Sequence, residues 1–128
     1  MNWQADLIAY RREKAVEAIE DAALLFDKKR LPATVNRIYY ALFYEISALL
    51  LNKKLSSSKH AGIRSLFNQH FVKEGIVKVE IGRFFSRMFD FRQKGDYADF
   101  VRFDEAEVKE WLEKAQEYIK DLEVIINP

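Results

Sequence analysis

The sequence predicts an all-α protein, folded as an antiparallel up-and-down bundle of four long helices plus one short helix. Apolar residues recur at three- and four-residue spacing through most of the chain, which is the pattern of amphipathic helices. No segment of convincing length alternates apolar and polar residues, as a half-buried strand does. Four glycines and two prolines in 128 residues leave few long loops. By its length we expect one domain, residues 1–128.

The first predicted helix covers residues 4–29 and the second covers residues 32–52. The first has one apolar face, formed by Ile8, Ala15, Ile19, Ala22 and Phe26. Pro32 suits the first turn of the second helix, because the N–H that proline lacks has no intrahelical partner there. The short connection between the two helices implies that they are antiparallel neighbours.

The second predicted helix is apolar around most of its circumference, so it is buried on more than one side. It is either the central helix of the bundle or a helix that also meets a second subunit. Tyr40 and Tyr44 lie on it, close to Asn36 and Arg37. Tyrosine hydroxyls that bond to an asparagine or arginine side chain are the commoner interpretation, and a binding role is the other.

A serine-rich loop, residues 53–59, offers N-cap candidates for a short third helix over residues 60–71. His60 and His70 lie ten residues apart, about 15 Å along a helix axis. That distance is too long for one metal ion, and the chain has neither a cysteine nor a third histidine. We therefore expect no metal site and interpret both histidines as partly buried structural or interface residues.

The fourth predicted helix covers residues 76–91, after a turn at residues 73–75, and ends before a break at Gly95. Arg83 and Arg87 form a basic ridge on it that leads toward Arg92. The fifth helix begins at Asp104, which makes a capping box with Glu107, and runs to residue 125.

Composition describes a soluble protein, because 49% of the residues are hydrophobic and 32% are charged, with no run of about 18 apolar residues. We see no signal-peptide layout, and the lack of cysteine fits the cytoplasm. Residues 52–94 hold ten basic and three acidic residues, a net charge of +7. Residues 104–128 hold three basic and eight acidic residues, a net charge of −5. This asymmetry either steers an anionic partner or reflects two solvated helix faces.

The stretch 89–100 is where chemistry can sit, because it gathers charged residues between aromatic ones. The chain has no glycine-rich phosphate loop, nucleophile elbow, paired-cysteine motif or metalloprotease helix. Five segments, 36–44, 48–50, 59–63, 67–73 and 92–97, together resemble the small prokaryotic HEPN (higher eukaryotes and prokaryotes nucleotide-binding) domains.

This resemblance implies a helical bundle that is usually dimeric and often encoded with a minimal nucleotidyltransferase as a toxin–antitoxin pair. Many HEPN proteins are metal-independent ribonucleases with a motif of Arg, four to six residues, then His. This sequence keeps Arg92 but has Tyr97 where the histidine is expected. A phenol is about one part in a thousand ionised at pH 7, a handicap of roughly 4 kcal/mol as a base relative to imidazole.

The site predicted from this resemblance is led by Arg92, which binds a phosphate group of RNA or a nucleotide. Lys94, Arg87 and Arg83 are further candidates for binding. Arg92 and Asp96 are the candidate catalytic residues of a weak ribonuclease activity. No cofactor is expected. The partner nucleotidyltransferase can transfer AMP to a tyrosine near the motif in this family, which makes Tyr97 a candidate acceptor.

Two alternatives use the same sequence. Arg92 can instead pair with an acidic neighbour, Asp90, Asp96 or Asp99, while Tyr97 packs over the helix junction. The protein can also be a non-catalytic interaction module, whose apolar second helix and acidic fifth helix bind a partner chain.

Overall fold

The computed structural model of the chain describes residues 2–97 and 102–128, and the side chains of residues 2–92 and 102–128. In this described part we find five α-helices, one π-helical turn and no strand. The prediction of an all-α bundle is therefore confirmed. The elements are α1 (Trp3–Asp27), α2 (Leu31–Asn52), α3 (His60–Phe67), η1 (Asn68–Val72), α4 (Val79–Tyr97) and α5 (Glu105–Ile126).

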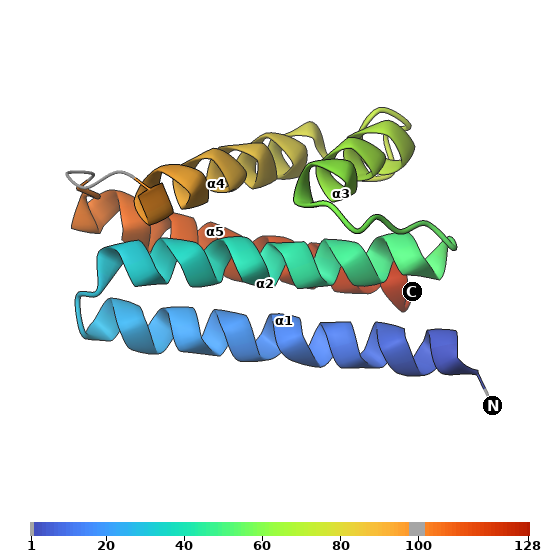
Figure 1. Cartoon of the computed structure of the whole chain (residues 1–128), viewed down its shortest axis with the longest axis horizontal. Helices are drawn as coiled ribbons and strands as arrows, with labels where there is room; N and C mark the ends of the chain where they lie inside the picture. Colours follow the sequence, from blue (N-terminus) through green and yellow to red (C-terminus); the bar gives the residue numbers. More distant parts are fainter. Residues whose placement is uncertain (1, 98–101) are drawn as a thin grey trace.

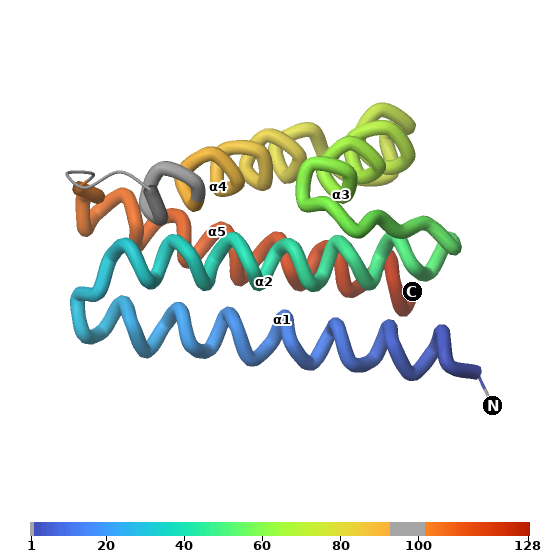
Figure 2. Tube along the Cα trace, in the orientation of Figure 1, coloured from blue at the N-terminus to red at the C-terminus, as the bar shows by residue number. Residues whose placement is uncertain are grey.

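Helix α2 is the central helix of the bundle. It lies between α1 on one side and α4 on the other, with α5 behind it and α3 over its C-terminal half (Figure 1). The colour gradient in Figure 2 shows that α1 and α4 run in one direction and α2 and α5 in the other. Most of the apolar circumference of α2 is therefore covered by helices of the same chain, and the prediction that it is the central helix is confirmed.

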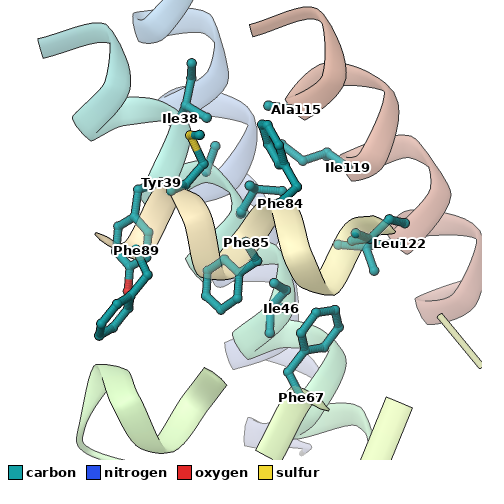
Figure 3. Close-up of a cluster of buried hydrophobic side chains, with 14 of the residues drawn as sticks. Ile38, Tyr39, Ile46, Phe67, Phe84, Phe85, Phe89, Ala115, Ile119 and Leu122 are labelled. Carbon is teal, nitrogen blue, oxygen red and sulfur yellow. The ribbon is translucent and has the colours of Figure 1, made fainter. Parts of the chain in front are cut away.

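Aromatic side chains from α2, α3 and α4 pack together in the core where these three helices meet (Figure 3). The Phe85 ring stacks on the Tyr39 ring with 5.6 Å between their centroids, and meets the Phe67 ring edge-on at 6.0 Å. All three rings are fully buried. The preceding residue, Phe84, points toward α5, where its ring contacts the Tyr118 ring edge-on. Helix α4 is thus held on α2 by one row of side chains and on α5 by another.

Two of the three predicted features at helix N-termini are confirmed. Pro32 lies in the first turn of α2, and the Asp104 carboxylate accepts a hydrogen bond from the Glu107 backbone N–H at 3.1 Å. The serine N-cap predicted for α3 is wrong. Lys59 occupies the N-cap position, and Ser57 Oγ instead accepts a hydrogen bond from the Lys59 backbone N–H. The serine therefore stabilises the loop before the cap.

Helix α4 is shifted toward the C-terminus relative to its predicted range of residues 76–91. It begins at Val79, because the N–H groups of Ile76 and Val77 both donate to the Phe71 carbonyl and hold these residues in the preceding turn. It then continues through Gly95 to Tyr97, so the predicted break at Gly95 is wrong. A glycine inside a helix costs about 1 kcal/mol relative to alanine, which is too little to end a helix by itself.

The third predicted helix is confirmed as one helical segment, but its last turn is wider than an α-helical turn. In η1 the Lys73 backbone N–H donates to the Asn68 carbonyl, five residues back, at 2.8 Å. Such π-helical turns are rare and hold one residue more per turn than the helix around them.

A charged side-chain group ties α1, α2 and α5 together. Arg12 Nε lies 3.3 Å from Glu45 Oε1, and Arg12 Nη2 lies 2.9 Å from Glu123 Oε1. The Glu45 side chain is only 2% exposed, whereas Glu123 is 52% exposed. Burial raises the pKa of Glu45 to about 6, although Arg12 acts in the opposite direction.

The buried carboxyl of Glu45 is expected to make stability depend on pH. Its pKa in the fold lies above its ordinary value of 4.5, so the folded state binds this proton more tightly than the unfolded state does. The stabilisation is complete below about pH 4.5 and is lost as the pH rises through about 6. The difference is about 2 kcal/mol.

Urea denaturation of the wild type and of Glu45→Gln at several pH values measures this contribution. The free energy of unfolding of Glu45→Gln, relative to the wild type, is expected to increase by about 2 kcal/mol between pH 4.5 and pH 7.5. Glu113→Gln, at an exposed position on α5, is the control and should show no such change. A constant difference between Glu45→Gln and the wild type would contradict the prediction.

Candidate functional site

Arg92 lies on the side of α4 that faces α2. Its Nη1 donates a hydrogen bond to the Tyr40 hydroxyl at 3.1 Å. Its guanidinium carbon lies 5.0 Å from the centroid of the Tyr39 ring and 5.7 Å from that of the Tyr40 ring. The sequence had suggested Asn36 or Arg37 of the same helix as the partner of a tyrosine hydroxyl, whereas the structure supplies the partner of Tyr40 from α4.

A second guanidinium lies against Tyr40. Arg37 stands 5.0 Å from the centroid of the Tyr40 ring, and its Nε and Nη2 donate to Asn36 Oδ1 at 3.2 and 3.0 Å. Contacts between a cation and an aromatic face contribute about 0.5–1 kcal/mol each at exposed sites. Tyr40 is half-buried, so it joins two positive side chains at the surface.

His60, the first residue of α3, completes this group of side chains. Its Nδ1 shares a hydrogen bond of 2.8 Å with the Tyr39 hydroxyl. Its ring stacks on Phe43, with 4.3 Å between centroids, and meets the Tyr40 ring edge-on at 5.8 Å. We use the name Arg92 cluster for Tyr39, Tyr40, Phe43, His60 and Arg92.

Protonation in the Arg92 cluster follows from burial and from the charge of Arg92. Burial, and then the positive charge of Arg92, lower the pKa of His60, so its imidazole is neutral at pH 7. Burial raises the pKa of Tyr39, and this outweighs the opposing effect of Arg92. The Tyr39 hydroxyl therefore keeps its proton, and the pair forms a neutral hydrogen bond beside a cation.

The sequence predicts that His60 is a partly buried structural or interface residue. The partial burial is confirmed, but the place of His60 beside Arg92 was not predicted. The one available signal was Tyr39, because a fully buried hydroxyl must have a hydrogen-bonding partner. Helical spacing cannot identify that partner, since it lies 21 residues away on another helix.

The predicted basic ridge lies elsewhere on α4. Arg87 stands 5.3 Å from the ring centroids of both Phe91 and Trp111, and 3.9 Å from the Glu107 carboxylate of α5. Arg83 and Arg87 also line a pocket of about 230 Å³ between α4 and α5. The structure does not bring these two arginines to the Arg92 cluster, and their role in binding stays a prediction.

Comparison with known proteins identifies the family. The model of the HEPN domain matches residues 8–125. The chain belongs to the HEPN family. This HEPN protein is 49% identical over 127 residues to a UPF0332 protein of Thermotoga maritima, a match that covers 99% of this chain and 96% of that protein.

Two HEPN relatives from Methanocaldococcus jannaschii carry names that refer to toxins. The protein named "Putative toxin MJ0142" is 30% identical over 107 residues, which cover 84% of this chain and 73% of that protein. The protein named "Putative toxin MJ0605" is 40% identical over 85 residues, which cover 66% of this chain and 63% of that protein. A toxin-like HEPN protein is thus the class that these relatives support.

The remaining residues of the predicted HEPN motif lie in the last turns of α4. Lys94, Asp96 and Tyr97 are helical, but their side chains lie outside the described part, as does Asp99. Their predicted roles are untested. Asp90, one of the alternative partners for Arg92, lies 3.9 Å from Arg64 Nη1.

Two further predictions concern metal ions and membranes. Among the residues that the structure describes, no three His, Asp or Glu side chains are grouped so that they can hold a metal ion. Within the same residues, none of the helices combines the length and apolar character that a membrane crossing requires.

Proposed function

We propose that this HEPN protein binds the phosphate groups of RNA through Arg92, as the toxin-like member of a two-component system with a minimal nucleotidyltransferase. The observation that carries the proposal is the fixed position of the Arg92 guanidinium, held by the Tyr40 hydroxyl and by two tyrosine faces. A guanidinium held in place loses less conformational entropy when it binds a phosphate. The names of the two M. jannaschii relatives support the toxin-like part.

The aromatic side chains beside Arg92 favour single-stranded RNA as the ligand. Tyr40, Phe43 and Tyr44 follow one another along α2, and all three residues are only partly buried. Proteins that bind single strands combine positive side chains with aromatic rings on which bases stack, and each stacked base contributes about 1–3 kcal/mol. Arg37 adds a second positive charge to the same surface.

Replacing Arg92 is expected to weaken RNA binding. A hydrogen bond between charged groups contributes about 1.5–3 kcal/mol, so Arg92→Ala should raise the Kd for a single-stranded 2′-O-methyl RNA by about 10- to 100-fold at fixed salt concentration. Such an RNA cannot be cleaved through its 2′-oxygen, so fluorescence anisotropy reports binding alone.

The control is Lys109→Ala, which removes one positive charge from an exposed position on α5. We expect its Kd to change less than about threefold, in line with the small effect of an exposed charge. Equal affinity of the wild type and Arg92→Ala would disprove the proposed role of Arg92. A larger loss in Arg83→Ala than in Arg92→Ala would move the binding site to the basic ridge.

The proposal also includes a homodimer, the partner enzyme and a weak metal-independent ribonuclease activity, all of which follow from the HEPN resemblance. Sedimentation at micromolar concentration distinguishes one chain from two. Incubation with the nucleotidyltransferase and ATP, followed by mass spectrometry, tests whether AMP is added to Tyr97, with Tyr97→Phe as the control. Stable binding of the nucleotidyltransferase without any binding of RNA would favour the non-catalytic interaction module.

A further inference from the structure

We infer that His60 is the acid–base group of the Arg92 cluster and that it acts in the cleavage of single-stranded RNA. In the HEPN motif this role belongs to a histidine, but this chain has Tyr97 at that position. His60 performs the role instead. This inference rests on the proposed function, because it needs RNA phosphate to bind at Arg92. It assigns the reaction to a residue on α3, outside the motif.

Geometry is the first support. His60 and Arg92 contact the same two tyrosine rings, although they come from different helices. The His60 ring lies 5.8 Å from the ring centroids of both Tyr39 and Tyr40, and the Arg92 guanidinium lies 5.0 and 5.7 Å from them. Both side chains are half-buried, so each has part of its surface open to solvent. A phosphate bound by Arg92 therefore lies near the imidazole.

The hydrogen bond of His60 is the second support, because it leaves the other ring nitrogen for chemistry. Nδ1 is engaged with the Tyr39 hydroxyl at 2.8 Å, and stacking on Phe43 fixes the plane of the ring. When Nδ1–H donates to the Tyr39 oxygen, the lone pair of Nε2 can accept a proton. After Nε2 is protonated, the same Nδ1–H···O hydrogen bond remains. Tyr39 is thus a positioning residue, and the neutral state of His60 at pH 7 suits a base.

The reaction is a transesterification within the RNA. His60 Nε2 takes the proton of a 2′-hydroxyl while the 2′-oxygen bonds to the adjacent phosphorus and the bond from phosphorus to the 5′-oxygen breaks. Water gives a proton to the departing 5′-oxygen, and the resulting hydroxide takes the proton from the imidazolium. Arg92 stabilises the negative charge on the phosphate oxygens. The products are a 2′,3′-cyclic phosphate and a 5′-hydroxyl.

Cleavage of end-labelled single-stranded RNA in the presence of EDTA tests the role of His60. We expect the wild type to cleave and His60→Gln to cleave at least about 100-fold more slowly, because acid–base groups contribute about 10²–10⁴-fold. His70→Gln removes the other histidine of the chain and should cleave like the wild type. His60→Gln should still bind the 2′-O-methyl RNA, since it keeps Arg92.

A second measurement does not depend on the folding of His60→Gln. In His70→Gln the only histidine is His60. Diethyl pyrocarbonate, with the modified residue located by mass spectrometry, should stop cleavage by this variant, and hydroxylamine should restore it. Bound 2′-O-methyl RNA should slow the modification.

The outcomes separate this inference from the proposed function. If the wild type binds RNA through Arg92 but does not cleave it, the inference and the ribonuclease part of the proposed function are wrong, and the proposed binding of RNA through Arg92 stands. If His60→Gln cleaves like the wild type, the inference is wrong and the proposed function stands. Continued cleavage after modification of His60 would overturn the inference in the same way. If the wild type does not bind RNA, both fall together.

Discussion

Replacing Arg12 by alanine is expected to lower the free energy of unfolding by about 3 kcal/mol at neutral pH. The substitution leaves the carboxylate of Glu45 in the core without the guanidinium that lies 3.3 Å from it. Breaking a buried ion pair by removing one partner costs about 3–5 kcal/mol. We expect the lower end, because the Arg12 side chain is 22% exposed and water can partly solvate the site. Urea denaturation followed by circular dichroism measures the loss.

Two matched variants show whether the unpaired carboxylate is the cause. Lys14→Ala, two residues along α1, removes a partly exposed lysine that lies 3.8 Å from Glu17, and it should cost less than about 1 kcal/mol. The double variant Arg12→Met/Glu45→Met removes both charges and should recover most of the lost stability. A double variant as unstable as Arg12→Ala would attribute the loss to packing and not to charge.

The second large effect is expected for Phe85→Ala, with a loss of about 4 kcal/mol. Phe85 is fully buried between Tyr39 and Phe67, and the substitution leaves a cavity that rigid neighbouring rings cannot fill. For a chain of this length the Tm should fall by roughly 10–20 °C. Calorimetry or thermal circular dichroism measures the change.

Phe85→Leu and Leu24→Ala are the controls for this cavity. Phe85→Leu keeps most of the buried volume and should cost about 1–2 kcal/mol. Leu24 is 65% exposed on α1, so its replacement by alanine should change stability by less than about 0.5 kcal/mol. Because the Phe85 ring supports the Tyr39 ring, Phe85→Ala should also weaken RNA binding. Unchanged stability of Phe85→Ala would contradict the packing described here.

Much of the fold was predictable because the apolar positions and the capping residues of a helix can be recognised within its own sequence. The apolar circumference of α2 predicted a central helix, and Asp104 predicted the start of α5. The end of α4 was not predictable in this way. A glycine has a local cost of about 1 kcal/mol, and tertiary contacts of the whole helix can outweigh it. Local preference alone therefore misplaced the boundary at Gly95.

The functional site was predicted only in part, because its residues are distant in the sequence. Arg92 was found through the HEPN motif, but its contact with Tyr40 joins residues 52 positions apart. In the sequence, His60 was considered only together with His70. The distance between the two excludes a shared metal ion but says nothing about which other residues His60 contacts. Only the packing of α3 on α2 shows that His60 faces Tyr39.

The π-helical turn in Asn68–Val72 has a consequence for comparing relatives of this protein. A π-helical turn holds one residue more than an α-helical turn, so deleting one residue from it would give a regular α-turn and leave α3 in the same orientation relative to α4. A deletion inside α3 itself would instead rotate His60 by about 100° about the helix axis, away from Tyr39. In an alignment, a one-residue gap at residues 68–72 is therefore compatible with a histidine beside the motif arginine, whereas a one-residue gap within α3 is not.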